Sequence, residues 1–359
     1  MTSAGGSITA DYQQYTDLSA MAYLCHFKIP EAVPLVGSVS YEQVADACNV
    51  DELQLRRILR FAMTNNLFRE LSPDEVAHTT YSAVLVTDPS TRAVVEYQCL
   101  EAFPASSKLV EAAERWPDAE EPSHTAWSLA NKSDWSYFEH ISQPENEKQM
   151  HRFVDCMSAG LSDPQWSIDH TISGYDWKSV KGTVVDVGGN QGQTAVALAS
   201  AFPHISRIMV QDLPSVVGPA EAALPSDLSK RISFQAHDFH VLQPAETSKA
   251  SLFILRFVLH DFANKPAARI IRNIVPALKQ GATLLIIDTV APPVGKLPAR
   301  EERAIRGLDV ELMSMLNGKE RSPEEWRELL HVADRNLEIQ DVNVQNGNGV
   351  GIIEVVYGS

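Results

Sequence analysis

A His-Asp pair directly after an apolar run is the part of this sequence best suited to acid–base chemistry. His260 and Asp261 follow the run Leu255–Leu259, Asp288 closes the next apolar run, and Glu320 stands in a Gly-Lys-Glu-Arg segment. A carboxylate on one imidazole nitrogen leaves the other nitrogen free to accept a proton. The pattern predicts a general base, His260, oriented by Asp288 and Glu320. Asp261 competes for the orienting role, although an acidic residue there more often caps the following helix.

A glycine turn upstream predicts a nucleoside site. The apolar run Val184–Val187 leads into Gly188, Gly189 and Gly192, and glycines let a backbone approach a ligand closely. The spacing is not G-x-G-x-x-G, so a nucleoside without phosphates, S-adenosylmethionine (SAM) above all, fits better than a dinucleotide. Acidic residues at successive strand ends give the expected contacts with SAM. Asp186 orders the loop or contacts the ammonium group of SAM, and Asp212 accepts hydrogen bonds from the ribose hydroxyls. Asp238 accepts a hydrogen bond from the adenine amino group, and Phe239 packs against the adenine ring.

The second half of the chain has the alternation of strands and helices that is typical of a parallel, doubly wound sheet. Helices are expected at 193–202 and 266–278. An Asn-Gly-Asn-Gly segment near the end predicts an antiparallel hairpin. The fold class is therefore α/β, a Rossmann-like sheet with a C-terminal hairpin, as in SAM methyltransferases. The expected strands are 183–187, 207–211, 232–236, 251–257, 283–288, 337–343 and 350–357.

The first half is predicted to be helical. Helices at 41–48 and 53–65, followed by two short strands around a Ser-Pro-Asp-Glu turn, have the pattern of a winged helix. Taken alone this could bind DNA, but its few arginines stand beside acidic residues, so packing or dimerisation is the better interpretation. We expect a helical dimerisation and substrate-pocket domain over 1–165 and a SAM-binding catalytic domain over 166–359.

Composition narrows the choice of partners and compartment. The net charge of −16 argues against broad contact with nucleic acid or an anionic membrane. The four cysteines form no Cys-x-x-Cys or Cys/His cluster, so neither a disulfide framework nor a metal site is expected. The polar start lacks an apolar signal region and no apolar run is long enough to span a bilayer, so a cytosolic protein is predicted.

Two further segments are candidates for a substrate pocket. Helices are expected at 92–115 and 146–160, and the second carries Phe153 and Met157 on one apolar face. That face forms either core or the wall of an apolar pocket, since methionine adapts to irregular shapes. In the segment Pro122–Trp127, His124 is either a loop residue or a hydrogen-bond donor to substrate, and Trp127 is either a pocket wall or core.

The combination of these motifs resembles the plant caffeate-type and fungal O-methyltransferases over nearly the whole chain. It consists of Asp-Val-Gly-Gly, Gln-Asp-Leu-Pro, Asp-Phe, Leu-Arg-Phe-Val-Leu-His-Asp-Phe and Gly-Lys-Glu-Arg. The resemblance implies methyl transfer from SAM to a hydroxyl of a small natural product, with His260 as the base flanked by Asp288 and Glu320, in a homodimer. Asp288 stands where the plant enzymes have the longer Glu. Asp309 and Met313 match the helix that faces the acceptor. The implied SAM contacts are Gly188, Asp212, Asp238, Phe239 and Arg256.

A second kind of chemistry is also consistent with the resemblance. Some fungal proteins of this type bind SAM without using its methyl group and catalyse pericyclic reactions of the Diels–Alder or Alder-ene kind by electrostatic stabilisation. Known examples can lack the base histidine, so the presence of His260 favours methyl transfer. In the pericyclic alternative, His124 would supply a hydrogen-bond donor.

Overall fold

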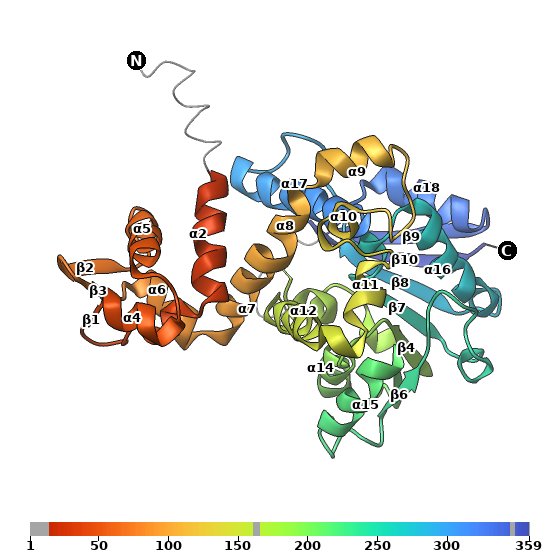
Figure 1. The fold of residues 1–359 in the computed structure, drawn as a ribbon. Coiled ribbons are helices and arrows are strands. Elements are labelled where there is room, and N and C mark those ends of the chain that lie inside the picture. The colour runs from red at the N-terminus through yellow and green to blue at the C-terminus, as the bar shows by residue number, and fades with distance from the viewer. Residues whose placement is uncertain (1–13, 161–165, 345–348, 359) are drawn as a thin grey trace. The chain divides into compact units, whose positions relative to one another are not determined.

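The computed structural model describes residues 14–160, 166–344 and 349–358. Contacts group the chain into two compact units: Met1–Ser107 with Pro144–Gly160, and Lys108–Gln143 with Leu161–Ser359. This division differs from the sequence-based boundary at residue 165. Residues 108–143 group with the second unit because α10 (Ala126–Asn131) packs against α9 (Leu109–Arg115) and α17 (Ala299–Leu316). Figure 1 shows the elements of both units.

The second unit is built on a seven-stranded sheet with the order β6-β5-β4-β7-β8-β10-β9. The first five strands in this order are parallel, and β10 runs antiparallel to both β8 and β9. The predicted fold class and hairpin are therefore confirmed, although residues 345–348 of the connection lie outside the described residues. The strands are β4 (Thr183–Val187), β5 (Arg207–Asp212), β6 (Ile232–Ala236), β7 (Leu252–Arg256), β8 (Thr283–Thr289), β9 (Leu337–Val344) and β10 (Val350–Tyr357).

Helices cover both faces of this sheet, so the central strands are apolar on both sides. On β4, Val185 belongs to the same core cluster as α16 (Asn264–Leu278) and α18 (Pro323–Ala333). Val184 belongs to a second cluster with α14 (Gln193–Ala201). The two cores hold the sheet rigid, and its carboxyl edge is the end at which the predicted site residues lie.

The remaining helical segments of the second unit are α11 (Tyr137–Ile141), α13 (Ile168–Ser173), α15 (Pro214–Ala223), η3 (Trp177–Ser179), η4 (Ala245–Thr247) and η5 (Leu259–Asp261).

The first unit contains the predicted winged helix. Helix α4 (Tyr41–Cys48) begins with a capping box at Ser40, and Asp51 caps α5 (Glu52–Met63) by accepting the N–H of Gln54. Strands β2 (Arg69–Ser72) and β3 (Glu75–Ala77) form the wing with β1 (Val39–Ser40). The other helices are α2 (Gln14–His26), α3 (Ile29–Ala32), α6 (Thr80–Thr87), η2 (Pro144–Asn146) and α12 (Glu147–Gly160).

The segment predicted as one helix over 92–115 is broken into several pieces. Helix α7 (Pro89–Tyr97) passes into a π-helical turn, η1 (Gln98–Ala102), and then into α8 (Phe103–Ser106), before α9 begins at Leu109. Pro104 explains the irregularity, because a proline ring inside a helix displaces the preceding turn and removes one N–H donor. Among the residues described, no helix is both long and apolar enough to cross a membrane.

Candidate active site

The predicted cofactor and base residues gather at the carboxyl edge of the sheet in the second unit. Asp186 and Asp212 lie at the ends of the neighbouring strands β4 and β5, and Arg256 ends β7 on the other side of β4. His260 follows β7 in η5, and Asp288 lies near the end of β8. Ligands of open parallel sheets bind at this edge, because loops leave it on both sides and form a crevice.

The glycine turn after β4 packs too closely against its neighbours to accept side chains. A Cβ on Gly188 (φ +70°) would lie 2.9 Å from Val258 Cγ2, and one on Gly189 would lie 2.7 Å from Asp186 Cγ. Asp186 is 1% exposed, and its Oδ2 has no hydrogen-bond partner among the described residues. A buried carboxylate oxygen without a donor is costly, and a ligand's ammonium group would satisfy it.

Asp212 accepts hydrogen bonds from the backbone of the same turn and from that of Leu213, the residue after it. Its Oδ2 accepts the N–H of Asn190 at 2.8 Å, and its Oδ1 accepts the N–H of Leu213 at 2.8 Å. Each carboxylate oxygen has a second lone pair, so both can still accept from a diol. Asp238 is exposed, and its Oδ1 accepts the N–H of His240. Phe239 packs edge-on against Phe262, with its ring 3.5 Å from the position of a Gly188 Cβ.

Buried charges of both signs stand beside the turn. Burial raises the pKa of Asp186 to about 7, with Arg256 opposing the rise and Asp212 adding to it. Burial lowers the pKa of Arg256 to about 10, against the pull of Asp186 and Asp288. The Arg256 guanidinium donates to the Trp166 carbonyl at 2.7 Å and to Thr171 Oγ1 at 3.2 Å. Arg256 is thus held in place by protein groups and contributes a fixed positive charge to the cofactor side.

His260 is surrounded by three carboxylates. Its Nδ1 lies 3.1 Å from Glu320 Oε1 and 3.4 Å from Asp288 Oδ1, and its backbone N–H donates to Asp288 Oδ2 at 3.1 Å. The shorter Asp288 side chain therefore does reach the imidazole. On the other ring nitrogen, Nε2 lies 3.5 Å from Asp261 Oδ1. The His260 side chain is 13% exposed, whereas those of Asp288 and Glu320 are fully buried.

These neighbours change the proton affinity of the imidazole. Burial by itself lowers the pKa of His260, but the negative charges of Asp288, Asp261 and Glu320 outweigh it and raise the pKa to about 10. Burial raises the pKa of Asp261 to about 7 and that of Asp288 to about 6. The attraction of His260 opposes both rises, and repulsion from acidic neighbours adds to them. Ligand atoms of His260, Asp288 and Glu320 lie within 4.8 Å of one another, a spacing that would also suit a cation. Nδ1 is, however, already paired with Glu320.

The acceptor-side candidates fall into two groups. Asp309 and Met313 lie one turn apart on α17; Asp309 Oδ1 accepts the N–H of Glu320 at 2.9 Å, and Met313 is 44% exposed. His124 stacks on Trp116 with the ring centroids 4.7 Å apart, and Trp127 is fully buried with no described hydrogen-bond partner for Nε1. The second group is on α12 of the first unit, where Phe153 is half-buried and Met157 is 39% exposed, so their contact with an acceptor stays a prediction.

Sequence reasoning misjudged one residue here and missed others. The capping interpretation of Asp261 is wrong, because α16 begins at Asn264 with Ala263 at its N-cap, and the Asp261 carboxylate faces His260 instead. Arg321, fully buried, donates to the carbonyls of Leu259 and Phe262, which bracket His260. Its sequence neighbours are polar and charged, so the sequence carries no signal of its burial.

Phe257 was also missed, because its backbone conformation has no sequence signal. It adopts φ +50° beside His260, with ring centroids 5.6 Å apart. A left-handed conformation costs an aromatic residue about 1 kcal/mol or more, and such strain concentrates at functional sites.

Comparisons with protein families and known sequences agree with this geometry. Residues 126–334 match the model of an O-methyltransferase domain, and residues 12–88 match that of an O-methyltransferase dimerisation domain. The O-methyltransferase VdtC of Byssochlamys spectabilis is 38% identical over 347 residues, covering 95% of this chain and 79% of that protein. The O-methyltransferase pgmB of Aspergillus terreus is 37% identical over 356 residues, covering 97% of this chain and 98% of that protein.

Solved structures share the fold at lower sequence identity. OxaC in complex with SAH and oxaline has a TM-score of 0.84 at 23% identity, covering 98% of this chain and 87% of that one. The mitomycin 7-O-methyltransferase MmcR has a TM-score of 0.80 at 24% identity, covering 99% and 98%. LepI, whose structure was solved in complex with SAM, has a TM-score of 0.77 at 23% identity, covering 100% and 90%.

Proposed function

This chain belongs to the O-methyltransferase family, as its family match and its fungal relatives establish, and we propose that His260 is the base of its methyl transfer from SAM to oxygen. The acceptor we propose is a small, largely apolar natural product with a phenol or enol hydroxyl. Asp288 and Glu320 orient the imidazole through Nδ1, so that Nε2 takes the acceptor's proton.

The observation that carries this proposal is the geometry around the His260 imidazole. Nδ1 lies 3.1 Å from Glu320 and 3.4 Å from Asp288, so two buried carboxylates fix the ring and pair with the imidazolium that forms when Nε2 takes a proton. The negative charges of the neighbouring carboxylates raise the pKa of His260 to about 10. The imidazolium therefore dominates at neutral pH, and the rate of methyl transfer should rise with pH as the base form becomes more populated.

The glycine turn and its acidic neighbours fit the cofactor. The unpartnered Oδ2 of Asp186 suits an ammonium group, and Asp212 has lone pairs left for a ribose diol. Gly188 and Gly189 are partly exposed and carry no side chain, so a ligand can contact the backbone of the turn. We assign Asp238, Phe239 and Arg256 to the same ligand. When bound, SAM supplies the electrophilic methyl group; the residues named here bind it and keep it aligned with the acceptor.

The experiment is label transfer from radioactive SAM to a panel of phenols, including orcinol and emodin, with S-adenosylhomocysteine measured in parallel. We expect methylated product and S-adenosylhomocysteine in equal amounts. His260→Ala should lower the rate by a factor of about 10² to 10⁴, the usual contribution of a general base, with SAM affinity unchanged. The matched control is His331→Ala on the exposed side of α18, which should keep full activity.

Three results would contradict the proposal. Unchanged turnover in His260→Ala removes His260 from the mechanism. Activity that chelator abolishes would show that the histidine–carboxylate cluster holds a metal. Acceptor conversion without formation of S-adenosylhomocysteine would support the alternative of SAM-dependent pericyclic chemistry.

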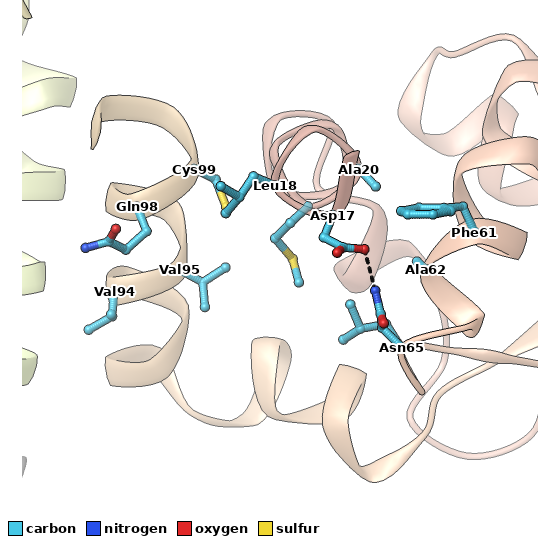
Figure 2. A pocket seen from close by; sticks show the side chains of 12 residues that line it. Asp17, Leu18, Ala20, Phe61, Ala62, Asn65, Val94, Val95, Gln98 and Cys99 are labelled. Carbon is cyan, nitrogen blue, oxygen red and sulfur yellow. Dashed lines mark hydrogen bonds between the residues drawn. The ribbon is translucent and has the colours of Figure 1, made fainter. Parts of the chain in front are cut away.

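For the first unit we propose homodimer formation through the surface around an apolar cavity of about 270 Å³. The cavity lies between α2, α5 and the α7–η1 segment, and residues 12–88 match a dimerisation domain. Figure 2 shows Phe61 and Leu18 at this cavity, with the Asn65–Asp17 hydrogen bond beside them. Phe61 and Leu18 are 36% and 39% exposed, so a second copy would remove apolar surface from water.

A further inference from the structure

We propose that Asn317 is a positioning residue that fixes the turn at Glu120–His124 to the loop of the base and thereby sets acceptor affinity; this inference rests on the proposed function. The Asn317 side chain donates from Nδ2 to the carbonyls of Glu121 and His124, each at 2.9 Å. Both bonds go to main-chain atoms, so they fix the path of the turn whatever its side chains are.

The same short segment contacts the base from its other end. A Cβ on Gly318 would collide with the His260 carbonyl oxygen, and the Lys319 N–H donates to that oxygen at 2.7 Å. Glu320 then pairs with the imidazole. The segment 317–320 therefore binds the turn through Asn317 and the His260 loop through Lys319 and Glu320, which keeps the two at a fixed separation.

The backbone at Asn317 explains why an asparagine suits this position. Asn317 is the C-cap of α17 and adopts φ +56°, a left-handed conformation that asparagine and glycine tolerate best. Of these two, only asparagine also offers an amide that can donate to both carbonyls. The residue thus ends the helix and binds the turn at once.

A second connection between the turn and the base region is weaker. The Lys265 N–H donates to Glu120 Oε1 at 3.3 Å, and its ammonium group pairs with Glu121 at 3.0 Å. The side chains of Lys265 and Glu121 are 70% and 55% exposed, and exposed ion pairs contribute little. Asn317 is therefore the main connection.

The turn leads directly into the acceptor-side elements. Thr125 caps α10, which packs against α17, the helix that carries Asp309 and Met313. His124 projects from the turn and stacks on Trp116. Releasing the turn should therefore change how the acceptor is held and leave the base, its carboxylates and the cofactor side unaltered.

The test compares Asn317→Gly and Asn317→Asp with the wild type. Glycine keeps the left-handed conformation and loses the donors; aspartate keeps the shape and replaces the donors by acceptors. We expect the KM for emodin to rise about tenfold or more in both variants, with kcat, SAM affinity and the pH profile unchanged. Emodin affinity measured by tryptophan fluorescence in the presence of S-adenosylhomocysteine should weaken equally, and this readout needs no turnover.

The matched control is Asn49→Gly, which alters an asparagine C-cap with φ +53° at the end of α4 in the first unit. It should change none of these values. Thermal unfolding shows whether each variant is folded. Unchanged emodin affinity in both Asn317 variants would overturn the proposal, as would a lower kcat with a displaced pH profile and unaltered KM. The proposed function is tested separately. If the wild type binds emodin but forms no S-adenosylhomocysteine with any phenol, the proposed function is contradicted. The comparison of emodin affinities between the wild type and the Asn317 variants still decides the role of Asn317.

Discussion

Replacing Asp261 with asparagine should make this protein more stable at alkaline pH. The pKa of Asp261 is raised from 3.8 to about 7, chiefly by burial, so the folded state disfavours its ionised form. A raised pKa contributes stability that is fully present below the unfolded value, near pH 4, and is lost as the pH rises through about 7. Above pH 8 the wild type therefore carries the whole cost of an ionised, crowded carboxylate, and an asparagine of the same shape does not.

The size of the effect follows from the pKa difference. About three pKa units at 1.4 kcal/mol each give roughly 4 kcal/mol. The Asp261 side chain is 20% exposed, and solvent screening reduces this figure to about 2 kcal/mol. For a domain of this size, 1 kcal/mol shifts Tm by about 2–4 °C, so Asp261→Asn should raise Tm by roughly 4–8 °C at pH 8.5 and by less at pH 5.

Differential scanning calorimetry at the two pH values measures this gain, with Asp227→Asn, an exposed substitution in the same unit, as the control. The same variant removes one of the three negative charges that raise the pKa of His260. The rising limb of the pH profile for methyl transfer should therefore move to lower pH. Equal melting temperatures for variant and wild type at pH 8.5 would refute the reasoning that these carboxylates are held together at the expense of stability.

Two further predictions concern the cofactor and the dimer. Asp212→Ala should weaken SAM binding at least tenfold in titration calorimetry. The substitution removes the carboxylate that accepts from the ribose and leaves the N–H groups of Asn190 and Leu213 without their acceptor. A normal affinity would show that the ribose contact is misassigned. Phe61→Glu, at the cavity of the first unit, should shift the mass measured by light scattering from dimer to monomer. Val36→Glu, a residue 90% exposed and not part of the cavity lining, should leave it unchanged, and a dimeric Phe61 variant would exclude this surface.

The sheet could be predicted closely because its strands are short apolar runs with clear ends. Strands β4, β6 and β10 begin and end where the sequence indicates, and the adjacency of β7 and β8 brings Asp288 to His260. The break in the helix before Lys108 was not anticipated, since the pattern of apolar residues continues through Pro104 while the backbone does not.

Contacts to main-chain atoms were beyond sequence reasoning. Asn317 reaches a turn almost two hundred residues earlier, and its partners are carbonyl oxygens that every residue type has. The role of Asp261 stayed open for a related reason. The sequence allows an acidic residue there either to cap the next helix or to orient His260, and only the geometry of η5 shows that its carboxylate turns back to the imidazole.

The way Arg321 binds the loop has a consequence for how this enzyme can diversify. Its guanidinium holds the carbonyls on either side of His260 and stacks on Trp326, so the shape of the loop depends on a side chain outside it. We therefore expect the loop to keep its path when the side chain of a neighbour such as Phe257 is changed. On the proposed roles of His260 and the 120–124 turn, libraries aimed at new acceptors should vary those neighbours and the turn while keeping Arg321 constant.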